Sequence, residues 1–289
     1  MLIEFKEELI RSDKSKHTIK AYVERITDFL KWLSVRYGES DIAAITTLDI
    51  REYQSYCLNI KKFAPSGIQQ RLSAIKAYCN FLFAKNVLSA NPSQSVKAIK
   101  IVKQDVAPQV LSKSDLHKYR REVHKSSNLR DIAIVEILLQ TGIRVSELVS
   151  IELDDIDISE RKGAVKIRQG KGNKFRMIPL STDARKAITD YLNVRQLTAD
   201  NVLLQGQRGA LTTDAISKLL KKYAQRVGLE EVVHCHLFRH QVATELLRKK
   251  KQDIALVAEL LGHSNLNTTL IYTKPTAEEK AKAVEGMFS

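Results

Sequence analysis

Apolar residues recur every three or four positions over most of the first hundred residues. This spacing predicts amphipathic helices over residues 15–38, 47–62 and 66–86. We expect Ser66, which follows a proline, to be the N-cap of the third helix. In the first helix the apolar positions are Ile19, Tyr22, Val23, Ile26, Phe29, Leu30 and Leu33. The pattern therefore indicates a small helical bundle.

The helical pattern is interrupted between Asn91 and Leu111. This stretch has two prolines, several basic residues and no sustained amphipathic period, which is typical of a linker between domains. A linker of this length can pass around a rod as thick as a DNA duplex. We predict a first domain over residues 1–97, a linker over 98–110 and a second domain over 111–289.

The second domain is expected to be mostly helical with one exception. Residues 163–180 contain two runs rich in Val, Ile, Phe and Met on either side of a "GKGN" turn, and this predicts a β-hairpin. Helical spacing resumes after it, over residues 181–195, 211–228, 238–250 and 253–263. The fold class is therefore mainly α, with a mixed α/β second domain that carries a small hairpin or sheet.

Composition supports two folded, basic domains. The chain has 289 residues, of which 44% are hydrophobic, enough for two cores. Its net charge is +14; residues 1–100 hold 16 Lys and Arg against 10 Asp and Glu, so they contribute +6 and the remainder +8. Charge spread over both domains indicates a polyanionic partner, most commonly nucleic acid, although a merely soluble basic surface stays an alternative.

The cysteines and apolar runs place limits on compartment. There are three cysteines and no CxxC pair, so neither a disulfide framework nor a cysteine zinc cluster is indicated. The first residues mix acids and bases, unlike a signal peptide, and no apolar run approaches the length of a membrane span. We expect a soluble, cytoplasmic protein without a membrane partner.

The first candidate for chemistry is Arg144, within "LLQTGIRVSELVSIEL". Gly142 is predicted to end one helix and "RVSEL" to begin the next, which places Arg144 at a helix N-terminus. A cation there is unfavourable unless an anion binds too, and a guanidinium beside backbone amides suits an oxyanion or a phosphate. The alternative is a surface ion pair with Glu147.

The second candidate is Lys171 at the predicted hairpin tip. Glycines on both sides of it allow the backbone to approach a ligand closely. A lysine there can lie against a phosphate, or can donate a proton if neighbouring cations lower its pKa. A solvated turn is equally rich in lysine, so the tip alone does not decide between these uses.

The third candidate is the histidine-rich stretch "HCHLFRHQVATEL". His236 and His240 are four apart and could share a zinc ion on one helix face. Against this, an HExxH site needs a glutamate where Leu237 stands, and Arg239 would repel a metal. We favour His236 and Arg239, three apart, as hydrogen-bond donors to a common anion.

A tyrosine then completes a site for phosphate chemistry. Tyr272, in "LLGHSNLNTTLIYTK", stands at an aliphatic spacing that is usually a core position. Phosphoryl transfer, however, needs cationic donors, a proton donor for the leaving oxygen and a nucleophile. The candidates are Arg144, His236, Arg239 and His263 as donors, Lys171 for the leaving group, and Tyr272 as nucleophile. There is no P-loop and no paired-carboxylate motif, and we expect no cofactor and no metal.

The order of four motifs resembles one known family. "TGIRVSEL", "GKGNK", "HLFRH" and "LGHSNLNTTLIYT" follow one another as in tyrosine recombinases, which include phage integrases, Xer proteins and transposon resolvases. The stretch "HTIKAYVERITDFLKWL" also looks like that family's N-terminal core-binding domain, a SAM-like domain of four-helix type. One departure is visible, because Leu237 and Phe238 stand where the family usually has an aspartate and a leucine.

The resemblance implies a reaction and an assembly. The six candidates above fall on the family's activating positions and on its nucleophile, Tyr272. The implied reaction cuts and rejoins duplex DNA through a 3′-phosphotyrosyl intermediate and a Holliday junction, without metal or ATP. The implied assembly is a homo-tetramer on two DNA sites, formed from a protein that is monomeric in solution. The implied role is that of a Xer-like recombinase, a resolvase or a mobile-element integrase.

Other functions stay open at this point. One is a DNA-binding protein of the same fold without catalysis, and another is a type IB topoisomerase, which uses similar chemistry without exchanging partners. A zinc-dependent hydrolase is a further class, and its activity would vanish with chelators.

The segment after Tyr272 has an apolar stripe at helical spacing. Its members are Ala277, Ala281, Val284 and Met287 or Phe288. Such a helix commonly packs on its own domain. The resemblance instead implies that it docks on the next protomer and links the position of Tyr272 to assembly.

Overall fold

The computed structural model divides into two compact units, Met1–Gln104 and Asp105–Ser289. It describes residues 1–38, 42–99, 108–168, 175–196, 200–207, 209–263, 265–275, 281 and 284–285. The division falls inside the predicted linker, and the exact domain boundaries stay a prediction. The described helices include none that is both long and apolar enough to cross a membrane.

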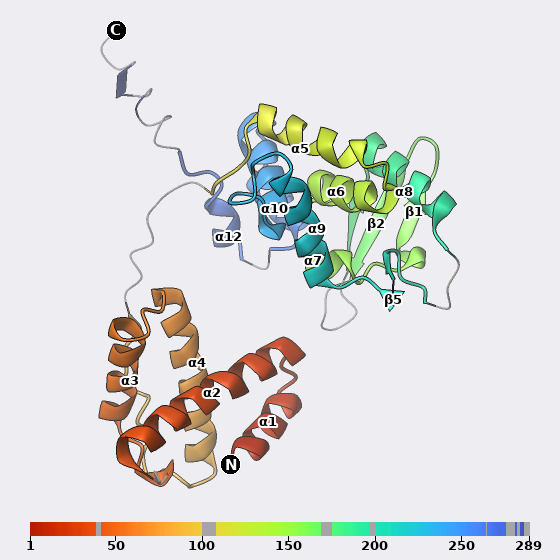
Figure 1. The fold of residues 1–289 in the computed structure, drawn as a ribbon. Helices are drawn as coiled ribbons and strands as arrows, with labels where there is room; N and C mark the ends of the chain where they lie inside the picture. The colour runs from red at the N-terminus through yellow and green to blue at the C-terminus, as the bar shows by residue number, and fades with distance from the viewer. Residues whose placement is uncertain are drawn as a thin grey trace. The chain divides into compact units, whose positions relative to one another are not determined.

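The first unit is helical (Figure 1). Its elements are α1 (Leu2–Arg11), α2 (Lys16–Tyr37), η1 (Ile42–Ala44), α3 (Thr47–Asn59) and α4 (Pro65–Ala84). The three predicted helices are confirmed as α2, α3 and α4. Helix α1 was not predicted, although Phe5 and Leu9 are buried and Leu2 packs against the same core.

Local signals explain where these helices begin. The Ser15 hydroxyl accepts from the backbone N–H of Thr18, and Thr46 forms a capping box with Asp49. The predicted N-cap Ser66 is wrong, because α4 begins one residue earlier. Pro65 occupies the first helical position, where its fixed φ and missing N–H are tolerated.

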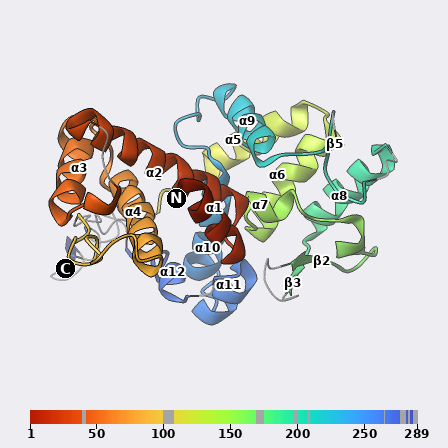
Figure 2. The same cartoon turned by 90° about the horizontal axis from the view of Figure 1, so that it is seen from below.

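The second unit is a mostly helical domain with small antiparallel sheets. Its first half contains α5 (Lys113–Lys125), α6 (Leu129–Thr141), α7 (Val145–Leu148), η2 (Leu153–Asp155), β1 (Ile156–Ile158), β2 (Gly163–Arg168), β3 (Phe175–Pro179) and α8 (Thr182–Val194). Its second half contains β4 (Gln205–Gly206), β5 (Gly209–Ala210), α9 (Thr213–Gln225), α10 (Cys235–Thr244), the π-helical turn η3 (Glu245–Lys249), α11 (Ile254–Leu261) and α12 (Asn267–Leu270). Helices α10, α11 and α12 lie together in both views (Figures 1 and 2).

The predicted hairpin is confirmed as strands β2 and β3 of a three-stranded antiparallel sheet in the order β1-β2-β3. Val165 pairs with Ile178, and both face the core, as alternation along a half-buried strand requires. The tip between these strands, residues 169–174 with Lys171, lies outside the described residues.

Helix α6 is the centre of the second unit's core. It packs against α5, α8, α9 and α10, and most of its residues are buried. A separate small cluster surrounds Tyr272 and consists of Val242, Ala243, Val257, Leu261 and Tyr272 itself. The site region is thus packed by residues of α10 and α11 rather than by the main core.

Part of the predicted C-terminal stripe can be placed. Ala281 and Val284 have helical backbone, and Val284 is 63% exposed. The other members, Ala277, Met287 and Phe288, lie outside the described residues, and docking of this segment stays a prediction.

Candidate active site

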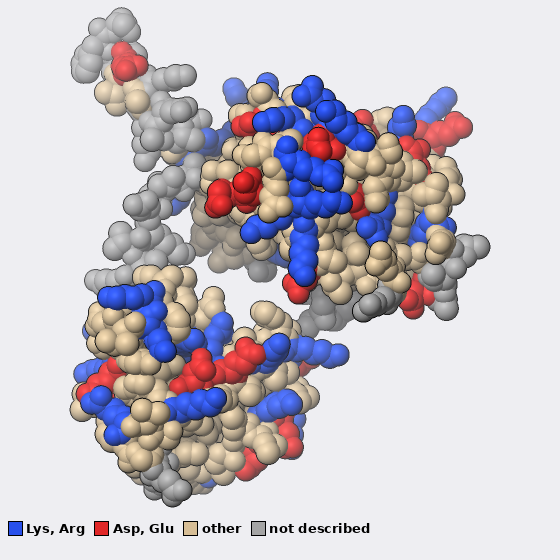
Figure 3. All heavy atoms as spheres, in the orientation of Figure 1, with Lys and Arg blue, Asp and Glu red and all other residues tan. Residues whose placement is uncertain are grey.

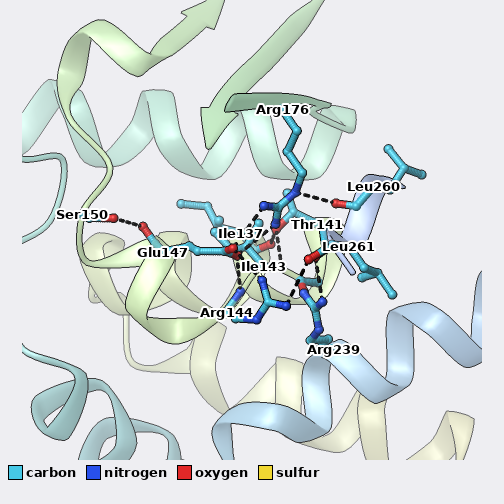
Figure 4. Close-up of polar contacts among 12 residues, drawn as sticks. Ile137, Thr141, Ile143, Arg144, Glu147, Ser150, Arg176, Arg239, Leu260 and Leu261 are labelled. Atoms are coloured by element: carbon cyan, nitrogen blue, oxygen red, sulfur yellow. Dashed lines mark hydrogen bonds and ion pairs between the residues drawn. The ribbon is translucent and has the colours of Figure 1, made fainter. Parts of the chain in front are cut away.

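Two helix ends meet at the candidate site. Helix α6 ends at Gly142 and α11 ends at Gly262, and both glycines adopt a left-handed conformation, with φ of 63° and 68°. The last carbonyls of a helix lack intrahelical donors and carry the negative end of its dipole. These two ends therefore offer carbonyl acceptors suited to cations, and three arginines use them (Figure 4).

Arg239 connects the two helix ends. It extends from α10 and is only 4% exposed. Its Nη1 donates to the Gly142 carbonyl at 3.0 Å and its Nη2 donates to the Leu261 carbonyl at 2.7 Å. Burial and the nearby charge of Arg144 lower the pKa of Arg239 to about 10, so it stays protonated at neutral pH.

Arg144 is the N-cap of α7, as predicted, and its guanidinium reaches the C-terminal end of α11. Its Nη2 donates to the Gly262 carbonyl at 3.1 Å. Its Nη1 donates to Glu147 Oε1 at 2.9 Å, and its backbone N–H donates to Glu147 Oε2 at 2.8 Å. The alternative pairing with Glu147 therefore exists, but the pair is not a surface one, because the Glu147 side chain is 13% exposed.

Arg176 is a third arginine at these helix ends, and it was not among the residues predicted from the sequence. Its Nε donates to the Leu260 carbonyl at 2.9 Å, and its two Nη atoms donate to the two Glu147 carboxylate oxygens at 3.0 and 2.9 Å. A signal was present in the sequence: along β3 the alternation places Arg176 on the same inward face as Ile178. A charged residue at an inward strand position indicates a buried ion pair.

Glu147 serves both Arg144 and Arg176. Burial alone would raise the pKa of this carboxyl, yet hydrogen bonds from Arg176 and the Arg144 backbone, with the charges of both arginines, hold the pKa below its usual value. Glu147 is therefore an ionised carboxylate that orients two guanidinium groups.

His263 follows the end of α11 directly. Its Nδ1 lies 2.7 Å from the Thr269 hydroxyl, and Thr269 is fully buried, so this contact sets the orientation of the ring. Burial, followed by the charges of Arg239 and Arg144, lowers the pKa of His263 to about 4. The ring is neutral at physiological pH and stacks on Tyr272, with centroids 6.4 Å apart and planes 6° apart.

Tyr272 lies within this group and is 2% exposed. Its hydroxyl oxygen is 2.8 Å from Nδ1 of His240, on α10. Burial raises the pKa of the Tyr272 phenol, whereas the charges of Arg239 and Arg144 act in the opposite direction. The cations that would hold an anion thus also favour the phenolate form.

The histidines of α10 divide between two environments. His240, considered above only for zinc, contacts Tyr272, and burial with His234 and His236 lowers its pKa to about 4. His236 is exposed, with its ring centroid 6.5 Å from that of His240. Among the described residues, no group of three or more His, Cys, Asp and Glu side chains is arranged to hold a metal ion.

The structure therefore brings together four of the six predicted residues. These are Arg144, Arg239, His263 and Tyr272. His236 lies in the first turn of α10 beside them and faces outward, and Lys171 lies outside the described residues.

Both units match known domains. Residues 101–279 match the phage integrase family, and residues 2–86 match its N-terminal SAM-like domain. The chain belongs to the phage integrase family. This confirms the resemblance expected from the four motifs, and it extends over both predicted domains.

Relatives of this phage integrase family member are similar over nearly their full length. Tyrosine recombinase XerC of Listeria innocua is 35% identical over 274 residues, which cover 91% of this chain and 89% of the relative. Tyrosine recombinase XerC of Pediococcus pentosaceus is 31% identical over 285 residues, which cover 95% and 92%.

Solved structures share the integrase fold at lower identity. The XerH site-specific recombinase bound to palindromic difH substrate, a post-cleavage complex, has a TM-score of 0.78 at 21% identity and covers 94% of this chain and 80% of its own. The Tn1549 transposon integrase in complex with circular intermediate DNA has a TM-score of 0.71 at 22% identity, with 98% of each chain covered. These likenesses establish the fold.

Proposed function

We propose that this protein is a site-specific DNA recombinase that cuts and rejoins duplex DNA through a 3′-phosphotyrosyl intermediate. Membership of the phage integrase family and the similarity to XerC proteins support a recombinase. One observation carries the assignment of residues: a buried tyrosine lies among arginines held at two helix ends, although these residues are far apart in the sequence.

In this proposal a DNA phosphate binds against Arg144 and Arg239. Their guanidinium groups donate to the nonbridging oxygens, and these bonds strengthen as negative charge builds on the oxygens in the transition state. Because the helix-end carbonyls fix the arginines beforehand, little reorganisation is needed during the reaction.

The bond changes balance without an external reactant. The Tyr272 oxygen attacks phosphorus and forms a phosphotyrosyl bond, while the bond from phosphorus to the 5′ oxygen breaks. Lys171 donates the proton that the leaving 5′ oxygen needs, and the phenol releases its own proton to solvent. Since one phosphodiester replaces another, the energy of the broken strand is retained and the 5′ hydroxyl can attack in reverse.

The two predicted histidines complete the proposed phosphate site. His263 is fixed by Thr269 through Nδ1, which leaves its other ring nitrogen for the phosphate. His236 is exposed in the first turn of α10 and can donate to the DNA when the phosphate arrives.

Basic side chains offer a surface for the duplex. Figure 3 shows Lys and Arg gathered over α9. Lys218, Lys221 and Lys222 are all exposed there and share one helix face, opposite the buried Ile216 and Leu220. We propose that such cations contact the phosphate backbone, so that binding weakens steeply with salt.

The proposed recombinase also requires an assembly on DNA. We propose that a protein that is monomeric in solution forms a homo-tetramer on two DNA sites and exchanges strands through a Holliday junction.

The cysteines Cys57, Cys79 and Cys235 are free thiols in the structure, as in a reducing cytoplasm, where we place the protein.

Trapping of the covalent adduct tests the proposal. Protein incubated with the duplex DNA that flanks its own coding sequence is expected to form an adduct, whose position is mapped by sequencing. Tyr272→Phe should bind the same DNA and form none. Tyr191→Phe is a matched control, because Tyr191 is also buried in this unit and its hydroxyl accepts from the Gln205 backbone.

Each other outcome identifies a different function. Adduct formation by Tyr272→Phe would refute the nucleophile. Binding without any adduct would favour a non-catalytic DNA-binding protein, and plasmid relaxation without partner exchange would favour a topoisomerase. Loss of activity with chelators would favour a zinc hydrolase.

A further inference from the structure

One continuous helix holds Tyr272 from two directions. The hydroxyl end of Tyr272 meets His240 of α10. Its backbone carbonyl accepts a hydrogen bond from Nε of Arg248 at 3.0 Å, and Nη2 of the same guanidinium donates to the carbonyl of Lys274. Arg248 lies in η3, which continues α10. The segment 272–274 therefore has both its side chain and its backbone attached to a single element.

The π-helical turn explains how one helix reaches both ends. In an α-helix of about 3.6 residues per turn, positions eight apart such as 240 and 248 lie about 80° apart around the axis. The backbone N–H of Lys250 bonds to the Glu245 carbonyl, five residues back, so the chain advances less around the axis per residue. This turn brings Arg248 closer to the face that carries His240.

Local hydrogen bonds also hold the backbone of this segment, since the Thr273 N–H bonds to the Leu270 carbonyl at 3.1 Å. Helix α12 before it is a single turn of four residues, and the Tyr272 N–H bonds to the Thr269 carbonyl of that turn at 3.1 Å. The tyrosine ring packs in the small cluster with Val242 and Leu261, apart from the main core. The Arg248 fork adds bonds from a separate element to the carbonyls on both sides of Thr273, and so helps to define the shape of the turn.

We propose that Arg248 is a positioning residue for the nucleophile. This proposal rests on the proposed role of Tyr272 as nucleophile. Arg248 would act through the backbone, without contact with the reacting atoms. Its two-pronged grip on residues 272 and 274 sets the direction from which the phenol oxygen, held near His240, approaches the phosphate.

The test compares Arg248→Ala and Arg248→Lys with Lys249→Ala in the full chain. Lys249→Ala is a matched control, because Lys249 lies in the same turn and its replacement also removes one positive charge. Unlike Arg248, the Lys249 ammonium pairs with Glu245. The first readout is the single-turnover rate of adduct formation at saturating protein, on the duplex that traps the wild type. DNA affinity is measured on the same duplex.

We expect Arg248→Ala to slow adduct formation about tenfold or more, since small misplacements of reacting groups cost that much or more. Its DNA affinity should equal that of Lys249→Ala. Arg248→Lys should fall between them, because an ammonium lacks the planar fork. An Arg248→Ala rate equal to that of Lys249→Ala overturns the proposal.

A second readout does not depend on activity. Protein labelled with 3-fluorotyrosine should give a Tyr272 resonance, identified by its loss in Tyr272→Phe. Arg248→Ala should shift or broaden this resonance, and Lys249→Ala should leave it unchanged. An unchanged Tyr272 resonance in Arg248→Ala would contradict the proposed positioning by Arg248. Failure of the wild-type protein to form an adduct would instead contradict the proposed function. If melting shows that Arg248→Ala is unfolded, Arg248→Lys decides by the same two readouts.

Discussion

The arginines of the site differ in the partners that hold them. Both side-chain bonds of Arg239 within the described structure go to carbonyls, whereas Arg176 is paired with the Glu147 carboxylate. A carbonyl offers only partial negative charge, so it orients a guanidinium without neutralising it. A carboxylate largely cancels the charge of its partner. Arg239 is therefore suited to bind an added anion, and Arg176, which gives both Nη atoms to Glu147, to support that carboxylate. Arg144 is intermediate, because one Nη donates to Glu147 and the other to the Gly262 carbonyl.

For each arginine proposed to bind the phosphate, the two-pronged geometry of the guanidinium should matter more than its charge. We expect Arg144→Lys and Arg239→Lys to reduce the single-turnover cleavage rate by about two powers of ten or more, because an ammonium cannot donate in two fixed directions. Arg226→Lys is the control, since its side chain is 46% exposed. Near-normal cleavage by Arg144→Lys would show that charge alone suffices.

The neutral state of His263 predicts a pH dependence of stability. Its pKa is about 4 in the fold, against about 6.5 in an unfolded chain. Between these values the unfolded chain binds a proton that the folded chain does not, so stability is complete above about pH 6.5 and falls as the pH decreases. Tm measured between pH 7.5 and 5 should decrease less for His263→Asn than for the wild type.

His17 provides the control for this effect. It is exposed in the first unit, and His17→Asn should follow the wild-type Tm profile. Parallel profiles for His263→Asn and the wild type would contradict the assigned cause.

The sequence indicated residue types better than residue contacts. Arg144, Arg239, His263 and Tyr272 were selected because phosphate chemistry needs such groups in a recognisable order. The contact between His240 and Tyr272 could not be predicted, because it joins two packed elements that lie 32 residues apart. Spacing within one helix shows which residues share its face, but not what that face meets.

At the scale of elements, the length of the periodic pattern determined which helices and strands could be predicted from the sequence. The long helices α2 and α4 and the hairpin β2-β3 have several repeats of their period and were predicted. Strands β4 and β5 have two residues each, too few for any alternation to be read. Turn η3 was not expected either, since a π turn has no distinct apolar period.

The glycine that ends α11 should be sensitive to a single methyl group. In Gly262→Ala the added Cβ would lie 2.5 Å from Arg176 Nη1, at a φ of 68° that alanine adopts with strain. We expect a loss of about 1–3 kcal/mol in the free energy of unfolding together with reduced cleavage. Denaturant titration and adduct trapping measure the two effects.

Gly228→Ala separates backbone strain from the clash. Gly228 has a φ of 70°, and the added Cβ would meet no heavy atom within 4 Å among the residues that the structure describes. It should lose stability from strain alone and keep its cleavage rate. Equal cleavage by both variants would mean that displacement of Arg176 has no effect on the site.

The hairpin is predicted to deliver the leaving-group proton through Lys171. A DNA substrate with sulfur at the bridging 5′ position has a leaving group that needs no proton. Lys171→Ala should therefore recover cleavage on this substrate, whereas Arg144→Ala should not. Equal rescue of both variants, or rescue of neither, would exclude this role for Lys171.

At the scale of the whole molecule, the predicted tail helix concerns assembly. Removal of residues 275–289 should leave binding to a single site intact and abolish synapsis of two sites, if this segment docks on a neighbouring protomer. Synapsis is measured by gel mobility on two-site DNA, and Tm is measured on the truncated monomer. A lower Tm with unchanged synapsis would mean that the segment packs on its own unit.

The division into two units was expected from the proline-bearing stretch, because a break in amphipathic period is visible in one dimension. Assembly is different in kind. Contacts between protomers depend on surfaces that no periodicity within one chain describes, so the tetramer rests on the family resemblance.

The meeting of two helix ends also determines when during folding the site can form. The carbonyls that hold Arg239 belong to Gly142 and Leu261, which are separated by well over a hundred residues. They come together only after α6, α10 and α11 have packed. If Tyr272 and Arg239 act as proposed, a nascent, misfolded or proteolysed copy that lacks any of these helices has the tyrosine but no anchored arginine to activate a phosphate. On the proposed function, DNA cleavage therefore becomes possible only after the whole domain has folded.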